Sequence, residues 1–183
     1  MSTVRTVNGV LRRYDLAPHR IRDYFKHAPT LVRDYPLEVC LSYMFSQVEV
    51  AHNMTLYCGA VKLHKADSNL TWEAIRRQHI TREGFQRLFE EIYGARIPAA
   101  SLTPLSAAEK VRDQVMHGKR PSEADKRAAV ANVIEYAEKL NEYLSSKAGL
   151  RPFGVLRGFK GRAKPLDKKT TRWILKGIGF DLS

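Results

Sequence analysis

Apolar residues recur at three- and four-residue steps through residues 37–66, the strongest periodic stretch of the chain. This spacing places them on one face of a helix, with polar residues such as Glu38 and Ser42 on the other. The apolar positions are Leu37, Leu41, Met44, Val48, Ala51, Met54, Cys58 and Val61. A helix of this length is typical of bundles, coiled coils and helical repeats. Since no repeat of about 20–50 residues is visible, we expect a helical bundle.

Three further stretches carry both helical spacing and boundary signals. We expect a short helix over 70–78, another from the cap Thr81 to the stop Gly94, and a long one over 122–146 that opens with a capping box at 122–125. The apolar stripe of the second consists of Phe85, Leu88, Phe89 and Ile92.

A helix is also predicted over 104–117, after a loop at 95–101. Its start signal is the hydroxyl of Thr103 ahead of Pro104, because proline suits the first turn of a helix. A capping box at 106–109 is the alternative start.

The two ends of the chain are less regular. Residues 1–36 predict one short helix, over 18–26, after which Pro29 and Pro36 interrupt the chain, and we expect an arm that packs over the body. Beyond Gly149 the chain becomes glycine-punctuated and basic, with a final short helix over 168–176.

An alternating pattern of the kind found in strands is conceivable only at 154–159, so the predicted fold class is all-α. We expect an antiparallel four- or five-helix bundle over 37–146 with short additional helices. The N-terminal arm covers 1–36, and a basic C-terminal extension, 147–183, packs on the bundle.

Composition changes this picture mainly through charge. The 183 residues are 44% hydrophobic and 27% charged, as in ordinary globular proteins, but 31 Lys and Arg face 19 Asp and Glu, a net charge of +12. Ten of the basic residues and one acid fall within 147–176, which places +9 there. Such an excess favours a polyanionic partner, most often nucleic acid.

Cys40 and Cys58 lie 18 residues apart in the predicted long helix, without metal-ligand spacing. They are expected to be buried apolar residues of a reduced, intracellular protein. The first residues lack the apolar core of a signal peptide, and no apolar run reaches the ~18 residues that span a bilayer. The expected location is the cytoplasm, with no membrane partner.

Arg112 and His117 are the sharpest chemical signal, five residues apart at the end of a predicted helix and followed by Gly118. On a regular helix they point about 140° apart and lie ~7.5 Å apart along the axis, so they converge only if His117 occupies a frayed last turn. A histidine can move the proton of a ribose 2′-hydroxyl or of a leaving oxygen, and an arginine can hold the phosphate, without a metal. The alternative is a helix-capping histidine and a solvated arginine.

In this context the chain resembles the HEPN family (higher eukaryotes and prokaryotes nucleotide-binding domain), whose signature is an arginine, a polar residue, a short spacer and a histidine. Arg112, Asp113 and His117 match it, and the likeness covers about 37–146. The resemblance implies a helical bundle that cleaves RNA without metal or other cofactor, as a homodimer in which two motifs face one site. A toxin, a defence factor or an RNA-processing enzyme would fit, the first with an antitoxin or regulatory protein as partner. Asp113 stands where the family often has asparagine and adds a negative charge near the phosphate.

The basic tail supplies a second signal, because its aromatic residues alternate with charges. Phe153, Phe159 or Trp173 could stack on bases while arginine and lysine neutralise phosphates. The candidate nucleic-acid contacts are Lys119 and Arg120, which adjoin His117, and Arg151, Arg157, Lys160, Arg162 and Lys164 in the tail. Alternatively, the tail docks through its apolar residues and its charges are solvated.

The absence of several well-known motifs excludes the corresponding classes of enzyme. The chain has no phosphate-binding P-loop, no Gly-x-Gly-x-x-Gly fingerprint and no Gly-x-Ser-x-Gly elbow. His52 and His64 are 12 residues apart without a further ligand, so no metal site is expected, and His52 is better explained as a satisfied polar position. Three hypotheses stay open: an endoribonuclease, a non-catalytic nucleic-acid-binding protein that uses the tail, and a helical scaffold for another protein.

Overall fold

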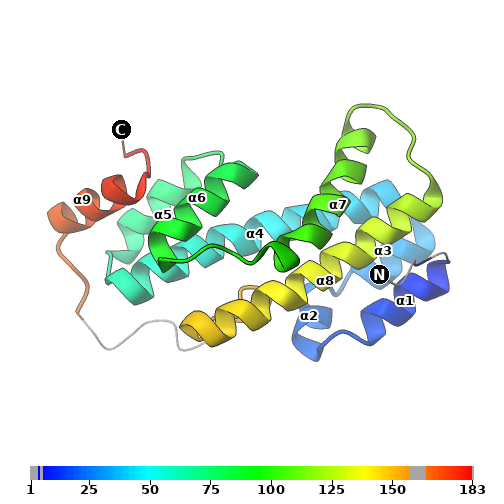
Figure 1. Cartoon of the computed structure of the whole chain (residues 1–183), viewed down its shortest axis with the longest axis horizontal. Coiled ribbons are helices and arrows are strands. Elements are labelled where there is room, and N and C mark those ends of the chain that lie inside the picture. The colour runs from blue at the N-terminus through cyan, green and yellow to red at the C-terminus, as the bar shows by residue number, and fades with distance from the viewer. Residues whose placement is uncertain (1–3, 5, 157–163, 183) are drawn as a thin grey trace.

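The computed structural model describes residues 4, 6–156 and 164–182, and every regular element in this part of the chain is a helix (Figure 1). The all-α prediction is therefore confirmed. The helices are α1 (Val7–Asp15), α2 (His19–Tyr24), α3 (Ala28–Asp34), α4 (Leu37–His64), α5 (Ser68–Arg76), α6 (Arg82–Tyr93), α7 (Ala99–Met116), α8 (Glu123–Ala148) and α9 (Lys168–Ile178).

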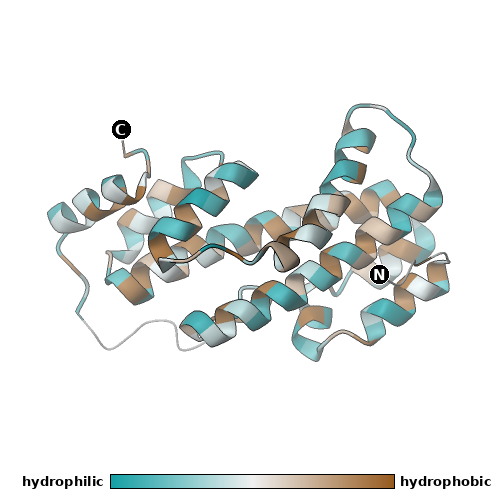
Figure 2. Cartoon of the chain, viewed as in Figure 1, coloured by the Kyte–Doolittle hydropathy of each residue, from teal (hydrophilic) through white to brown (hydrophobic). Residues whose placement is uncertain are grey.

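Three long helices, α4, α7 and α8, form the body of the molecule. α8 packs along α7 and against α4, and α4 also carries α5 and α6 on its C-terminal half (Figure 1). Apolar residues of these helices turn toward one another (Figure 2). Leu41, Leu56, Ile134 and Leu140 are at most 1% exposed, so a single core runs the length of α4.

α4 is buried on more of its surface than its amphipathic pattern alone requires. Both Cys40 and Cys58 are buried in it and free, as predicted, and burial raises the pKa of each thiol to about 12. The helix ends at His64, two residues short of the predicted boundary, where Lys65 takes a left-handed conformation with φ 56°.

The predicted caps of α6 and α8 are confirmed. Thr81 accepts a hydrogen bond from the N–H of Gly84, and Gly94 ends α6 with φ 62°. Ser122 and Asp125 form the capping box of α8, and Gly149 ends that helix with φ 64°. The left-handed conformation closes a helix and suits glycine, which has no Cβ to clash.

The N-terminal region contains three helices where one was predicted. Pro29 lies in the first turn of α3 and does not interrupt it, because the missing N–H of proline has no helical partner there. α1 packs on α8, and α3 on α4. Val10, Ile21 and Phe25 are at most 1% exposed and contribute to the same core as the long helices.

The predicted start of α7 is wrong. The helix begins at Ala99 after Pro98, so Pro104 lies inside it, and neither Thr103 nor the 106–109 segment caps it. Pro104 has no N–H for the carbonyl of Ala100, and Nζ of Lys139 on α8 donates to that oxygen at 3.1 Å instead. A neighbouring helix thus satisfies the carbonyl that the proline leaves without its helical partner.

The described part of the C-terminal region packs on the other helices. Thr171 and Leu175 of α9 are fully buried against α5 and α6, and the N–H of Asp67 donates to Oγ1 of Thr171 at 3.0 Å. α9 confirms the helix predicted over 168–176. Within the described residues, no helix is both long and apolar enough to cross a membrane.

Candidate functional site

Arg112 lies near the C-terminal end of α7 and faces α4. Its Cζ atom is 5.3 Å from the centre of the Phe45 ring, and Phe45 is only 4% exposed. A guanidinium over an aromatic face is attracted by the ring quadrupole. With a side chain 36% exposed, Arg112 is oriented by the body of the protein and still open to an incoming group.

Two carboxylates lie near the Arg112 guanidinium, close to the limit of ion-pair distance. Oε1 of Glu49 and Oδ1 of Asp113 each lie 3.8 Å from a guanidinium nitrogen, and both acidic side chains are more than half exposed. Exposed ion pairs of this kind contribute at most ~1 kcal/mol. A phosphate with two oxygens in hydrogen-bonding range can therefore replace them.

His117 is the C-cap of α7 and is exposed. Its backbone N–H donates to the carbonyl of Asp113 at 3.0 Å, and Gly118 follows with φ 71°, which turns the chain away. The N–H of Lys119 then closes the helix end by donating to Gln114 at 2.8 Å. His117 thus lies at the C-terminal end of α7, and this helix end projects from the body of the molecule (Figure 1).

The structure places five of the predicted residues at this one turn. They are Arg112, Asp113, His117, Lys119 and Arg120, and all but the half-exposed Arg112 are exposed. In the described part of the chain the Arg112 and His117 side chains do not hydrogen-bond each other, as their helical spacing predicts.

The other residues predicted to contact nucleic acid lie away from the α7–α8 turn or outside the described residues. Arg151 follows α8 and lies beside α2, whereas the exposed Lys164 precedes α9. The structure therefore does not bring these two to the α7–α8 turn. Arg157, Lys160 and Arg162 lie outside the described residues.

Of the aromatic residues predicted to stack on bases, Phe153 is buried, so that prediction is wrong, whereas Trp173 is exposed and can reach a base. Phe153 is 0% exposed and packs against the rings of Tyr24, Phe25 and Tyr136, so it anchors the chain and cannot meet a base. Trp173 on α9 is 78% exposed. Phe159 lies outside the described residues.

A polar cluster one helical turn before Arg112 was not predicted from the sequence. Glu109 of α7 accepts a hydrogen bond from Arg82 of α6 at 2.6 Å, and the same guanidinium nitrogen lies 3.2 Å from Oγ of Ser106. Partial burial raises the pKa of Glu109, and the Arg82 charge opposes this rise. The pair ties α6 to α7 just beneath the motif.

Beside this pair, Nε2 of His52 lies 2.6 Å from the hydroxyl of Tyr136, and its ring stacks on Phe85 at 3.8 Å between centroids. Burial lowers the pKa of His52 to about 3, and the nearby Arg82 charge adds to the effect. Burial also raises the pKa of Tyr136. His52 is thus a neutral, hydrogen-bonded residue, in agreement with the satisfied polar position expected for it.

No sequence pattern links Phe45 or Glu49 to the motif. Both look like ordinary positions of the long helix, and only packing against α7 brings them to Arg112. Among the described residues no group of three His, Cys, Asp or Glu is arranged to hold a metal ion.

Comparison of the chain with protein-family models, with curated proteins and with solved structures finds no match. The function is therefore inferred from the chemistry of these residues and from the motif that they form.

Proposed function

We propose that this protein is a metal-independent endoribonuclease of the HEPN type, in which Arg112 and His117 act on the scissile phosphate. The observation that carries the proposal is the α7–α8 turn: an arginine oriented by Phe45 yet half-exposed, and an exposed histidine at the end of the same helix. Lys119 and Arg120 extend the positive charge of this turn toward the RNA. Toxin, defence and RNA-processing roles in the cytoplasm all fit such an activity.

The proposed chemistry needs only proton transfer and charge stabilisation. An imidazole of His117 takes the proton of a ribose 2′-hydroxyl, whose oxygen attacks the adjacent phosphorus. The bond from phosphorus to the 5′-oxygen breaks, and that oxygen receives a proton from a second, protonated imidazole. The products are a 2′,3′-cyclic phosphate and a 5′-hydroxyl. Arg112 stabilises the charge that develops on the non-bridging oxygens.

Two proton transfers require two imidazoles or a second proton donor, and one chain offers one histidine at the turn. A second copy of the chain would supply the other, which supports the proposal of a homodimer. Exposed apolar side chains flank the motif in a way that favours self-association: Met116, next to His117, is 62% exposed, and Val50, next to Glu49, is 48% exposed.

RNA cleavage by the purified protein in EDTA tests this proposal. We expect cleavage by the native protein, and a loss of about 100-fold or more in both His117→Ala and Arg112→Ala with helical circular dichroism unchanged. His79→Ala, which changes an exposed histidine on the α5–α6 connection, serves as the matched control. Undiminished cleavage in the two motif variants would falsify the proposal.

A second candidate function, non-catalytic nucleic-acid binding, is favoured by the exposed face of α9. Lys169, Arg172, Lys176 and Trp173 fall within an arc of about 100° on this helix, opposite the buried Thr171 and Leu175. An exposed tryptophan beside three cations offers a base-stacking surface next to phosphate contacts. This face therefore supports RNA binding whether or not the protein cleaves RNA.

Point substitutions test the α9 face, because removal of 147–183 would also take Phe153 and Leu175 out of the core. Glutamine at Lys169, Arg172 and Lys176 together should flatten the salt dependence of RNA binding by about three counterion contacts, and Trp173→Ala should weaken binding further. Arg87→Gln, at an exposed position on α6, is the control. Equal affinity and salt dependence in all variants would exclude this role for α9.

A further inference from the structure

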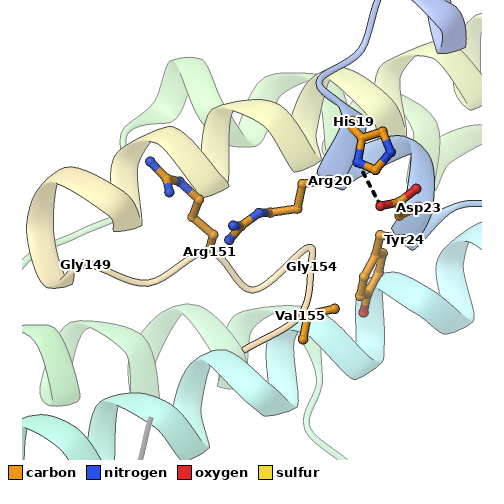
Figure 3. A pocket seen from close by; sticks show the side chains of 8 residues that line it. All are labelled: His19, Arg20, Asp23, Tyr24, Gly149, Arg151, Gly154 and Val155. Carbon is orange, nitrogen blue, oxygen red and sulfur yellow. Dashed lines mark ion pairs between the residues drawn. The ribbon is translucent and has the colours of Figure 1, made fainter. Parts of the chain in front are cut away.

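A cleft on the other side of α8 joins segments that are far apart in the sequence. The beginning of α2, the last turns of α8 and the residues after Gly149 surround two adjoining cavities of about 670 and 830 Å³, of which Figure 3 shows the first. Arg20 and Arg151 line both of them. The first cavity also contains His19, Asp23, Tyr24 and Val155.

The loop that carries Arg151 is fixed to α8. The N–H of Phe153 donates to Oδ1 of Asn141, and Nδ2 of Asn141 donates back to the Phe153 carbonyl, both at 2.9 Å. Asn141 is 7% exposed and Phe153 is 0% exposed. A buried two-way hydrogen bond of this kind holds the backbone in one position, so the loop next to Arg151 is preorganised.

Gly154 admits the side chain of Arg20 against this loop. A Cβ at position 154 would lie 2.3 Å from Cγ and 2.4 Å from Cδ of Arg20, closer than real contacts allow. Glycine there lets the Arg20 stem lie along the backbone, and its guanidinium points toward Arg151 (Figure 3). Arg20 from α2 and Arg151 from the loop therefore line the same cleft, and the Arg20 guanidinium reaches the base of the Arg151 side chain (Figure 3).

The acids of the first cavity do not neutralise these arginines. Within the described part of the chain, neither guanidinium has a carboxylate oxygen inside 4.0 Å, and Asp23 is instead 2.9 Å from Nδ1 of His19. In the second cavity Glu138 is paired with Arg13, and Glu142 is exposed. Two arginines without an acidic partner leave the lining of this cleft positively charged, which favours an anion there.

From this geometry we propose that the cleft binds a phosphate group between Arg20 and Arg151. Paired guanidiniums match the oxygens of a phosphate through two-pronged hydrogen bonds. The first cavity exceeds the size of a phosphate and lies in the range of cavities that hold small organic ligands, about 300–1,000 Å³. The phosphate therefore belongs to a larger molecule, either a free nucleotide or an RNA strand.

This site is distinct from the α7–α8 turn. In Figure 1 the beginning of α2 and the end of α8 lie at the lower edge of the molecule, and the α7–α8 turn projects at its upper edge. Binding in the cleft is thus independent of the proposed cleavage and does not require His117.

Isothermal titration of the full chain tests the cleft, with adenosine monophosphate, a short 2′-O-methyl oligoribonucleotide bearing a 5′-phosphate, and the same oligoribonucleotide with a 5′-hydroxyl. The 2′-O-methyl groups remove the nucleophile of the proposed cleavage, so the strands stay intact during the titration. We expect at least one probe to bind, and Arg20→Gln or Arg151→Gln to weaken that binding by about tenfold or more. Arg12→Gln, at an exposed position of α1, should leave it unchanged. Gly154→Ala should weaken it as well, because the added Cβ displaces Arg20 while both charges remain.

The pattern among the probes identifies the source of the phosphate. Tight binding of the mononucleotide indicates a free nucleotide, and preference for the 5′-phosphorylated strand indicates an RNA end. Equal binding of both strands, weakened by the two arginine variants, indicates a backbone phosphate. If no probe binds, or if binding is unaffected in both Arg20→Gln and Arg151→Gln with helicity retained, the cleft is not a phosphate site.

Discussion

Arg112 shows how the immediate surroundings of a side chain set what it can bind. Phe45 holds its guanidinium in place, while Glu49 and Asp113 compete with any phosphate for the same charge. Because both acids lie 3.8 Å away and are mostly exposed, they weaken the site without blocking it. The identity of residue 113 is therefore the simplest way to adjust the proposed activity.

Asp113→Asn should raise RNA cleavage. The substitution keeps a hydrogen-bonding side chain and removes a mostly exposed negative charge beside the phosphate. With the screening of bulk water such a charge is worth about 1 kcal/mol at ~4 Å, or roughly a fivefold gain in kcat/KM. Asp34→Asn, an exposed position on α3, makes the same change in net charge and should have no effect on cleavage in EDTA. A drop in kcat/KM with Asp113→Asn would mean that the carboxylate itself takes part in the reaction.

His52 should make the fold sensitive to acid. Its pKa is about 3 in the folded protein against an ordinary value near 6.5, so below pH 6.5 the unfolded chain binds a proton that the folded chain does not. Its stabilising effect is complete above pH 6.5 and is lost as the pH falls toward 3. Between pH 7 and pH 5 the free energy of unfolding should fall by about 1–2 kcal/mol from this residue alone.

Urea unfolding of the native protein and of His52→Gln at pH 7 and pH 5 measures this effect. Glutamine retains a group that can hydrogen-bond Tyr136 but does not titrate, so the variant should lose less stability between the two pH values. His79→Gln, at an exposed position, should behave like the native protein. The same pH dependence in His52→Gln and native protein would show that His52 titrates normally.

At the scale of the elements, a lysine of α8 supplies a hydrogen bond that Pro104 removes from α7. Pro104 is buried inside α7, and Lys139 donates to the Ala100 carbonyl that the proline leaves unpaired. Lys139→Met should therefore cost about 1 kcal/mol of unfolding free energy. In the Pro104→Ala background, where residue 104 can donate to Ala100 itself, the cost should be smaller.

A double-mutant cycle on Pro104 and Lys139 checks this by urea unfolding, and it also removes the contribution of the Lys139–Glu135 ion pair, which is common to both backgrounds. Lys147→Met on the same helix is the control for loss of a lysine. Equal costs of Lys139→Met in the two backgrounds would mean that the lysine does not compensate for the proline.

Local sequence signals predicted helix ends correctly where these ends are set by interactions between neighbouring residues. Ser122 with Asp125, and Thr81 with Gly94, set the ends of α8 and α6 as expected, because capping involves only neighbouring backbone groups. Pro29 and Pro104 misled the prediction for opposite reasons. The first fits an early helical turn, and the second is tolerated because another helix supplies a donor, which no local pattern reveals.

At the scale of the whole molecule, the α7–α8 turn and the α9 face, both proposed to contact RNA, lie apart along α4. Arg112 contacts Glu49, and the segment leading into α9 bonds to Lys65, 16 residues further on, or about 24 Å along the helix. The sequence predicted Arg112, Asp113 and His117 as a motif because they are neighbours in the chain. It could not predict Phe45 as a support or Phe153 as a buried anchor, since both roles arise from tertiary packing.

The central claim, that His117 from two copies of the chain completes one RNA-cleaving site beside Arg112, is tested with heterodimers. Native and His117→Ala chains, co-expressed with different tags and purified through both, form heterodimers that hold both arginines and one intact histidine. We expect these heterodimers to cleave RNA in EDTA at least about tenfold more slowly than the native homodimer, because one of the two proton transfers loses its imidazole. Heterodimers that keep half or more of the native rate, formed in confirmed one-to-one ratio, would contradict the claim.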